Sequence, residues 1–110
     1  MKLPFGELAE IPIEKTTKYL LNIEHPQNKG KAYFYFKIGF DEKQAEALKD
    51  AILNIAKTGT VQNIQTNEEG VKYEVLGTLI APNGKEYPLK TIWIIENNNQ
   101  KPRLVTAYPN

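Results

Sequence analysis

The spacing of apolar residues changes once along this chain, and that change constrains the fold more than any other feature. Between residues 41 and 58 the apolar positions recur at the three- and four-residue spacing of one helix face, at Ala45, Leu48, Ile52 and Ile55. Further on, Val71, Tyr73 and Val75 alternate with charged residues, as in a strand with one buried face. The pattern predicts an α+β domain with helices in the first half and an antiparallel sheet in the second.

The central helix is expected over Asp41 to Thr58. Asp41 is a good N-cap residue, and Gln44 stands three residues later, as in a capping box. Gly59 follows as a residue that can adopt the left-handed conformation at a helix C-terminus. A shorter helix is expected from Glu14 to about Leu21, ending before a proline.

The second half predicts a meander of three or four strands. Residues 61–66 are a possible first strand, and Pro82, Asn83 and Gly84 form a turn signal between two β-rich runs. Residues 89–95 are apolar enough for a strand buried on both faces. The run of asparagines at 97–99 predicts the next turn, and Arg103 to Tyr108 the last strand. Residues 29–40 are ambiguous, because their aromatics fit a strand as well as a helix.

Composition limits the chemistry that the chain can perform. Its 110 residues, with 41% apolar and 25% charged side chains, fit one domain over residues 1–110. There is no cysteine and only one histidine, so we expect no disulfide, no zinc site and no cofactor. No apolar run is long enough to cross a membrane, and the start lacks the pattern of a signal peptide, so the expected location is cytoplasmic. A net charge of +1 predicts no strong overall field.

His25 and the nearby lysines are the first candidate functional residues. His25 is the single imidazole and could act as a general acid or base, although a loop histidine bonded to backbone is an equal alternative. Lysines at 29, 31 and 37 are interleaved with Tyr33 and Tyr35, a combination that could bind phosphate and stack on bases. From composition alone, a solvated face with core aromatics is the more common explanation of such a cluster.

The last two predicted strands supply the other candidates. Arg103 stands among apolar residues and could hold a phosphate bidentately, or pair with Glu74 or Glu96 at a sheet edge. We expect Thr106 to share a face with Arg103. Trp93 is a candidate ligand platform, although tryptophans in strands are more often core residues.

Several motifs together resemble an uncharacterised bacterial family catalogued as a domain of unknown function. The first is Lys15-x-x-x-Tyr19-Leu-Leu-Asn-x-x-His25-Pro, followed by Gly-Lys31-Ala-x-x-Phe. The others are a glycine–phenylalanine pair before the central helix, a strand with Trp93, and Pro-Arg103-Leu-Val-Thr at the end. The match covers nearly the whole chain. It implies that residues 31–37 form a helix rather than a strand.

The resemblance implies a function as well. Members resemble stand-alone proteins or modules of secreted polymorphic toxins, and stand-alone members tend to be encoded beside a small SH3-like protein, as in a toxin–antitoxin pair. The helices-then-sheet order is similar to the barnase, EndoU, colicin and RelE group of metal-independent ribonucleases. The hypothesis is therefore a toxin-like ribonuclease with an RNA substrate, in a cleft where the helices cover the sheet. The alternative is a non-catalytic protein-interaction module.

The ribonuclease hypothesis assigns roles to seven residues. The expected catalytic residues are His25, Lys31 and Arg103. The expected substrate-binding residues are Lys15, Tyr19, Trp93 and Thr106.

Overall fold

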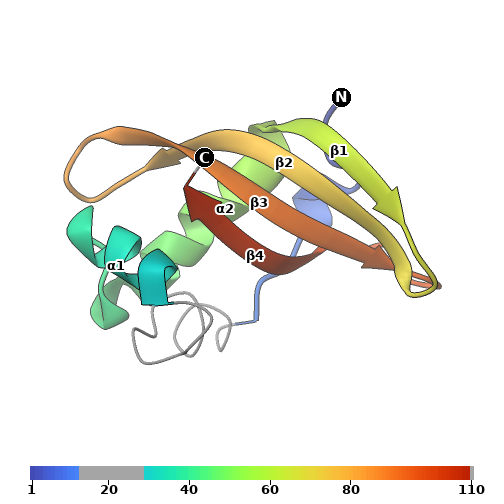
Figure 1. Cartoon of the computed structure of the whole chain (residues 1–110), viewed down its shortest axis with the longest axis horizontal. Coiled ribbons are helices and arrows are strands. Elements are labelled where there is room, and N and C mark those ends of the chain that lie inside the picture. Colours follow the sequence, from blue (N-terminus) through green and yellow to red (C-terminus); the bar gives the residue numbers. More distant parts are fainter. Residues whose placement is uncertain (13–28, 110) are drawn as a thin grey trace.

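The computed structural model describes residues 1–12 and 29–109, and shows helices packed on a four-stranded antiparallel sheet (Figure 1). In chain order the elements are α1 (Lys29–Lys37), α2 (Ala45–Thr58), β1 (Thr60–Thr66), β2 (Gly70–Ile80), β3 (Glu86–Glu96) and β4 (Arg103–Pro109). The strands follow one another in the order β1-β2-β3-β4. The α+β prediction is confirmed, with the larger of the two expected strand numbers. The helix expected from Glu14 to Leu21 lies outside the described residues.

The aromatic segment, which the sequence left ambiguous between strand and helix, forms helix α1, as the family resemblance implied. Its Tyr35 is fully buried, and the phenolic hydroxyl donates a hydrogen bond of 2.7 Å to the carbonyl oxygen of Ala107 in β4. The ring of Phe34 lies edge-on to Tyr87 of β3, with centroids 5.8 Å apart. Tyr33 of the same helix is exposed. The aromatics of this helix therefore fasten it to the sheet.

The start of the central helix differs from the prediction. Asp41 does cap, with its carboxylate accepting from the Lys43 backbone N–H at 2.9 Å, but it caps a 3-10 turn over Glu42–Gln44. Helix α2 begins after this turn, with Gln44 at its N-cap. The predicted capping box is wrong, because Oε1 of Gln44 is buried and has no hydrogen-bond partner among the described residues. A tight first turn replaces it.

Gly59 ends helix α2 for a different reason from the predicted one. Its φ of −74° and ψ of 172° are extended, so the expected left-handed cap is wrong. A Cβ atom at this position would lie 2.7 Å from Cγ1 of Val75 and 2.8 Å from the carbonyl oxygen of Ile55. Glycine is therefore required here by the close approach of the helix end to β2.

Both predicted turns of the meander are present. The Gly84 N–H bonds to the Ala81 carbonyl at 3.0 Å, and Gly84 has a φ of +83° that suits glycine. At the other end, the Asn99 N–H bonds to the Glu96 carbonyl, and Asn98 adopts a φ of +66°. Asparagine tolerates this left-handed conformation better than most residues. These turns set the pairing of β2 with β3 and of β3 with β4.

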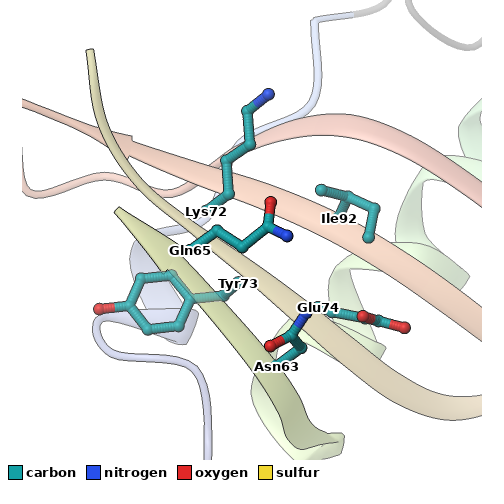
Figure 2. Close-up of a pocket in the computed structure, with 6 residues that line it drawn as sticks. All are labelled: Asn63, Gln65, Lys72, Tyr73, Glu74 and Ile92. Carbon is teal, nitrogen blue, oxygen red and sulfur yellow. The ribbon is translucent and has the colours of Figure 1, made fainter. Parts of the chain in front are cut away.

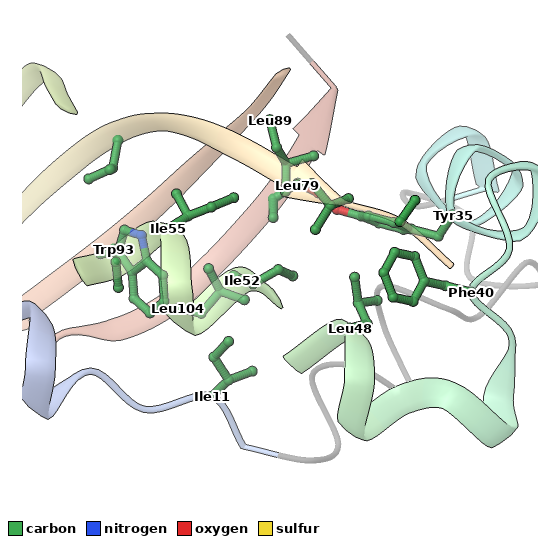
Figure 3. Close-up of a cluster of buried hydrophobic side chains, with 14 of the residues drawn as sticks. Ile11, Tyr35, Phe40, Leu48, Ile52, Ile55, Leu79, Leu89, Trp93 and Leu104 are labelled. Carbon is green, nitrogen blue, oxygen red and sulfur yellow. The ribbon is translucent and has the colours of Figure 1, made fainter. Parts of the chain in front are cut away.

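The core lies between α2 and one face of the sheet (Figure 3). Leu48, Ile52 and Ile55 of α2 are fully buried, as the helical spacing predicted, and each such burial contributes about 1.5–3 kcal/mol. The sheet and the N-terminal segment supply the facing side chains, which include Ile11, Val75, Leu79, Leu89, Trp93 and Leu104. The dense apolar run of β3 is buried fully only at Trp93 and Ile94, with Ile92 and Ile95 half-buried, so the prediction of burial on both faces holds in part.

Candidate nucleic-acid interface on the outer sheet face

The two faces of the sheet have different chemistry. The inner face carries the core residues and meets α2. We call the opposite side the outer face, and the strand register assigns its residues because paired side chains point the same way. Ile94 of β3 pairs with Lys72 of β2 and with Arg103 of β4. The residues that alternate with the core side chains on these central strands include the charged Lys72, Glu74, Glu86, Lys90 and Glu96 and the apolar Leu76, Ile80, Ile92 and Ile94. The described helices leave this face uncovered.

Two β-bulges place further polar side chains on the outer face. In β4 the register skips Val105, so that Thr106 pairs with Ile92 and Arg103 with Ile94. Thr106 and Arg103 are three residues apart and would face opposite sides of a regular strand, so the bulge is what puts them on one face. In β1 the register skips Gln62 in the same way, which brings Asn63 opposite Glu74.

The charges of the outer face are partly paired. Nζ of Lys90 lies 2.7 Å from Oε1 of Glu74, and the hydrogen bond to this carboxylate raises the pKa of Lys90 above its usual value. Nη2 of Arg103 lies 2.9 Å from Oε1 of Glu96, and about half of each of these two side chains is exposed. Lys72 has no ion pair within the described chain. Exposed pairs of this kind are weak, so an anion of higher charge can compete for Arg103.

A pocket of about 210 Å³ opens beside these charges. It is lined by Asn63 and Gln65 of β1, Lys72, Tyr73 and Glu74 of β2, and Ile92 of β3. Figure 2 shows the ring of Tyr73 pointing away from the other five side chains, which agrees with its place on the inner face. The pocket therefore combines two amides, one cation, one carboxylate and one apolar side chain.

The structure separates the residues predicted for one site. Arg103 and Thr106 lie together on the outer face, so the expected cleft between helices and sheet is wrong for them; that space is filled by the core. Lys31 belongs to α1, which is anchored on the inner side at the far end of β4. Lys15, Tyr19 and His25 lie outside the described residues.

Trp93 is placed in the core. It is fully buried, and its indole Nε1–H donates to Oγ1 of Thr91 at 2.7 Å, so its ring offers no surface to a ligand. The common interpretation of a strand tryptophan as a core residue holds here.

The sequence does not point to Lys72 and Lys90 as site residues, and Glu74 is expected there only as a possible partner of Arg103. The signal was present, because Lys72 and Glu74 are the charged residues that alternate with Val71, Tyr73 and Val75. The alternation predicts a strand, but which residues of the other strands lie beside its polar half depends on the register of the sheet. Asn63 gave no such signal, since only the bulge turns it to the outer face.

Comparison with known proteins agrees with the fold. The features above define a small α+β domain with an open, charged sheet face. The model of a domain of unknown function, DUF6883, matches residues 2–110, and the chain belongs to this family. No functionally curated protein matches the chain.

Among solved structures, the chain is similar to one chain of a contact-dependent growth inhibition toxin–immunity protein complex from Klebsiella pneumoniae 342. The TM-score is 0.74 at 14% sequence identity, over 96% of each chain. This similarity shows a shared fold. In the described residues, no helix is long and apolar enough to cross a membrane.

Proposed function

We propose that this domain is a toxin-like, metal-independent ribonuclease that binds RNA across the outer face of its sheet. The observation that carries the proposal is the grouping of Arg103, Thr106, Lys72 and Lys90 on the one sheet face that the described helices leave open. Guanidinium, ammonium and hydroxyl groups are the usual partners of RNA phosphates. The fold shared with a chain of a toxin–immunity complex supports a place in such a system.

The reaction follows from the hydroxyl that RNA carries and DNA lacks. The ribose 2′-oxygen loses its proton to a general base and attacks the adjacent phosphorus, and the bond to the 5′-oxygen of the next nucleotide breaks. The leaving oxygen takes a proton from a general acid, and a cyclic phosphate and a 5′-hydroxyl result. Arg103 stabilises the charge that grows on the phosphate oxygens, and Thr106 donates to the same group. His25 is the proposed general base or acid, and Lys31 is the weaker candidate because its helix α1 is anchored on the inner side of the sheet, away from Arg103.

In the absence of RNA, the guanidinium of Arg103 is paired with the carboxylate of Glu96. The exposed pair holds the guanidinium on the outer face, and a phosphate that displaces the carboxylate gains a bidentate partner. Binding therefore exchanges one anion for another, so the charge of Arg103 is never left unpaired.

The test is cleavage of RNA by the purified chain in EDTA. We expect internal cleavage with cyclic phosphate ends, mapped by sequencing of the fragments. The Arg103→Ala variant should lose about a hundredfold or more in rate, which is typical for a group that stabilises transition-state charge. Lys101→Ala is the matched control, because Lys101 is exposed in the turn before β4 and off the sheet face. Intact RNA with a natively folded wild-type chain would refute the proposal.

His25 and Lys31 are separated by substitution in the same assay. If either residue acts as acid or base, its alanine variant loses cleavage while RNA binding is retained, and the rate–pH profile of the His25→Ala variant loses the limb near neutral pH. Equal rates for wild type and both variants would remove these two residues from the mechanism.

A second function is favoured by one observation, the character of strand β1. This edge strand runs Thr-Val-Gln-Asn-Ile-Gln-Thr without a charge, although exposed edges are usually protected by charges or prolines. Met1 covers its start through a 2.8 Å bond from the Val61 N–H. The rest of the edge could accept a strand from a protein partner, such as a small SH3-like protein encoded alongside. Tight binding of that partner by a chain that cleaves no RNA would favour this role.

A further inference from the structure

The pocket at the β1 side of the outer face is not used by the chemistry proposed above. It lies two strands away from Arg103, because Lys72 and Arg103 flank Ile94 from opposite sides. At the spacing of neighbouring strands, this separation is on the order of 10 Å. A nucleotide next to the phosphate held by Arg103 can span such a distance.

We infer that the pocket lined by Asn63, Gln65, Lys72, Glu74 and Ile92 binds one base of single-stranded RNA by its edge. This inference rests on the proposed function and adds a source of sequence preference to it. Single-stranded RNA is read by hydrogen bonds to the edges of unstacked bases, and side-chain amides are suited to this because each offers a donor beside an acceptor.

The side-chain amides of Asn63 and Gln65 differ in which of their hydrogen-bonding groups are available to a ligand. Oδ1 of Asn63 already accepts from the Ile64 backbone N–H at 3.0 Å, which fixes the side chain and leaves its NH₂ group as a donor. The side-chain amide of Gln65 makes no hydrogen bond within the described residues, so both its oxygen and its NH₂ group are available. The neighbouring carboxylate of Glu74 keeps one oxygen on Lys90 and has a second acceptor oxygen. Together they form a row of one fixed donor, one adjustable amide and one acceptor.

The rest of the pocket suits the other parts of a nucleotide. Ile92 is half-buried and provides an apolar contact for the face of a base. Lys72 pairs with Gln65 across the strands, so its ammonium group lies at the border of the pocket, where it can meet a phosphate. The bulge at Gln62 is what turns Asn63 into this group, and bulges that re-aim side chains occur often beside functional sites.

The experiment measures base preference by binding as well as by cleavage. Labelled homopolymeric RNA oligonucleotides of the four bases are titrated with the wild-type chain and followed by fluorescence anisotropy. We expect one base to bind at least about fivefold better than the weakest, the lower end of what a bidentate amide–base contact gives. The Asn63→Ala/Gln65→Ala double variant should bind all four with equal affinity.

Two further variants serve as controls. Arg103→Ala should weaken binding of every oligonucleotide and keep the preference, because phosphate contacts carry no sequence information. Thr66→Ala changes the same strand on its inner face and should leave both quantities unchanged. The inference is overturned if the wild type shows no preference or no binding, or if the preference survives in the double variant.

The two proposals fail separately. A chain that selects a base but leaves RNA intact keeps the pocket and refutes the ribonuclease. A chain whose cleavage sites are the same in wild type and double variant keeps the ribonuclease and refutes the pocket.

Discussion

Thr91 links two buried polar groups through one side-chain hydroxyl. Its side chain is fully buried, accepts from the Trp93 indole N–H at 2.7 Å and donates to the Val75 carbonyl at 2.9 Å. One hydroxyl thus satisfies a donor and an acceptor in the core. This explains how a tryptophan can be placed in the interior of so small a domain.

Replacing Thr91 by valine should therefore be costly although the two side chains have the same shape. We expect a loss of about 2–3 kcal/mol in the free energy of unfolding, because the buried indole N–H loses its acceptor and the Val75 carbonyl loses the hydroxyl that donates to it. Urea denaturation followed by the fluorescence of Trp93 measures it. The control is Thr78→Val on β2, where the side chain is exposed and the change should stay within about 0.5 kcal/mol. Equal effects of the two substitutions would contradict the bridging role.

The Arg103–Glu96 pair offers a test of whether Arg103 serves structure or binding. In Glu96→Gln the guanidinium loses its competing carboxylate, so affinity for RNA should rise several-fold, while stability falls by less than about 1 kcal/mol because the pair is exposed. Anisotropy titration and denaturation measure the two effects. The control is Glu86→Gln, which makes the same charge change at the far end of β3. An unchanged affinity would assign Arg103 a purely structural role.

At the scale of elements, two glycines are required for different reasons, one by lack of space and the other by its backbone conformation. Gly59 is confined by Val75 and Ile55, whereas Gly84 has open space around its α-carbon but a positive φ. The same type of residue therefore has a packing role at the end of α2 and a conformational role in the β2–β3 turn.

Alanine and asparagine substitutions should separate these roles. At Gly59 both should destabilise by about 1–3 kcal/mol, because any Cβ collides with β2. At Gly84 alanine should cost about 1 kcal/mol and asparagine much less, because asparagine tolerates the left-handed region. Thermal unfolding of the four variants measures the difference. If asparagine rescued position 59 as well, the packing explanation would be wrong.

The same scale shows what sequence could and could not predict. The spacing of Leu48, Ile52 and Ile55 predicts α2, and turn residues predict both hairpins, because these signals are local. The two bulges could not be predicted, because no local pattern marks the shifts at Gln62 and Val105 that place Asn63 beside Glu74 and keep Arg103 and Thr106 on one face. Arg103 was singled out correctly as a polar residue on the last strand, but the face on which it lies depends on its pairing with β3.

For the molecule as a whole, the net charge of +1 is matched by a nearly balanced outer face. This face carries three cations, Lys72, Lys90 and Arg103, beside the carboxylates of Glu74 and Glu96, and α2 lies behind the sheet (Figure 1). RNA binding should therefore be modestly dependent on salt. For single strands the logarithm of affinity falls with that of salt by about 0.7 per phosphate, so three contacts give a slope of about −2.

A salt titration of the wild type and of Arg103→Ala measures this slope. The slope for the Arg103→Ala variant should be shallower by about 0.7, which is the contribution of one phosphate contact. The Lys101→Ala variant should keep the wild-type slope. A wild-type slope near zero would show that the outer face does not neutralise phosphates.

The N-terminal segment touches both edges of the sheet. Met1 bonds to Val61 of β1, while Glu10 forms a parallel bridge to Arg103 of β4, with its N–H on the Pro102 carbonyl at 2.9 Å. The two partners of the bridge stand at opposite ends of the chain. A contact between residues so far apart in the sequence closes slowly. We therefore expect the amide hydrogens of Glu10 and Leu104 to become protected from exchange after those of the β2–β3 hairpin. Pairing of the N-terminal segment with β4 would then be the final step of folding.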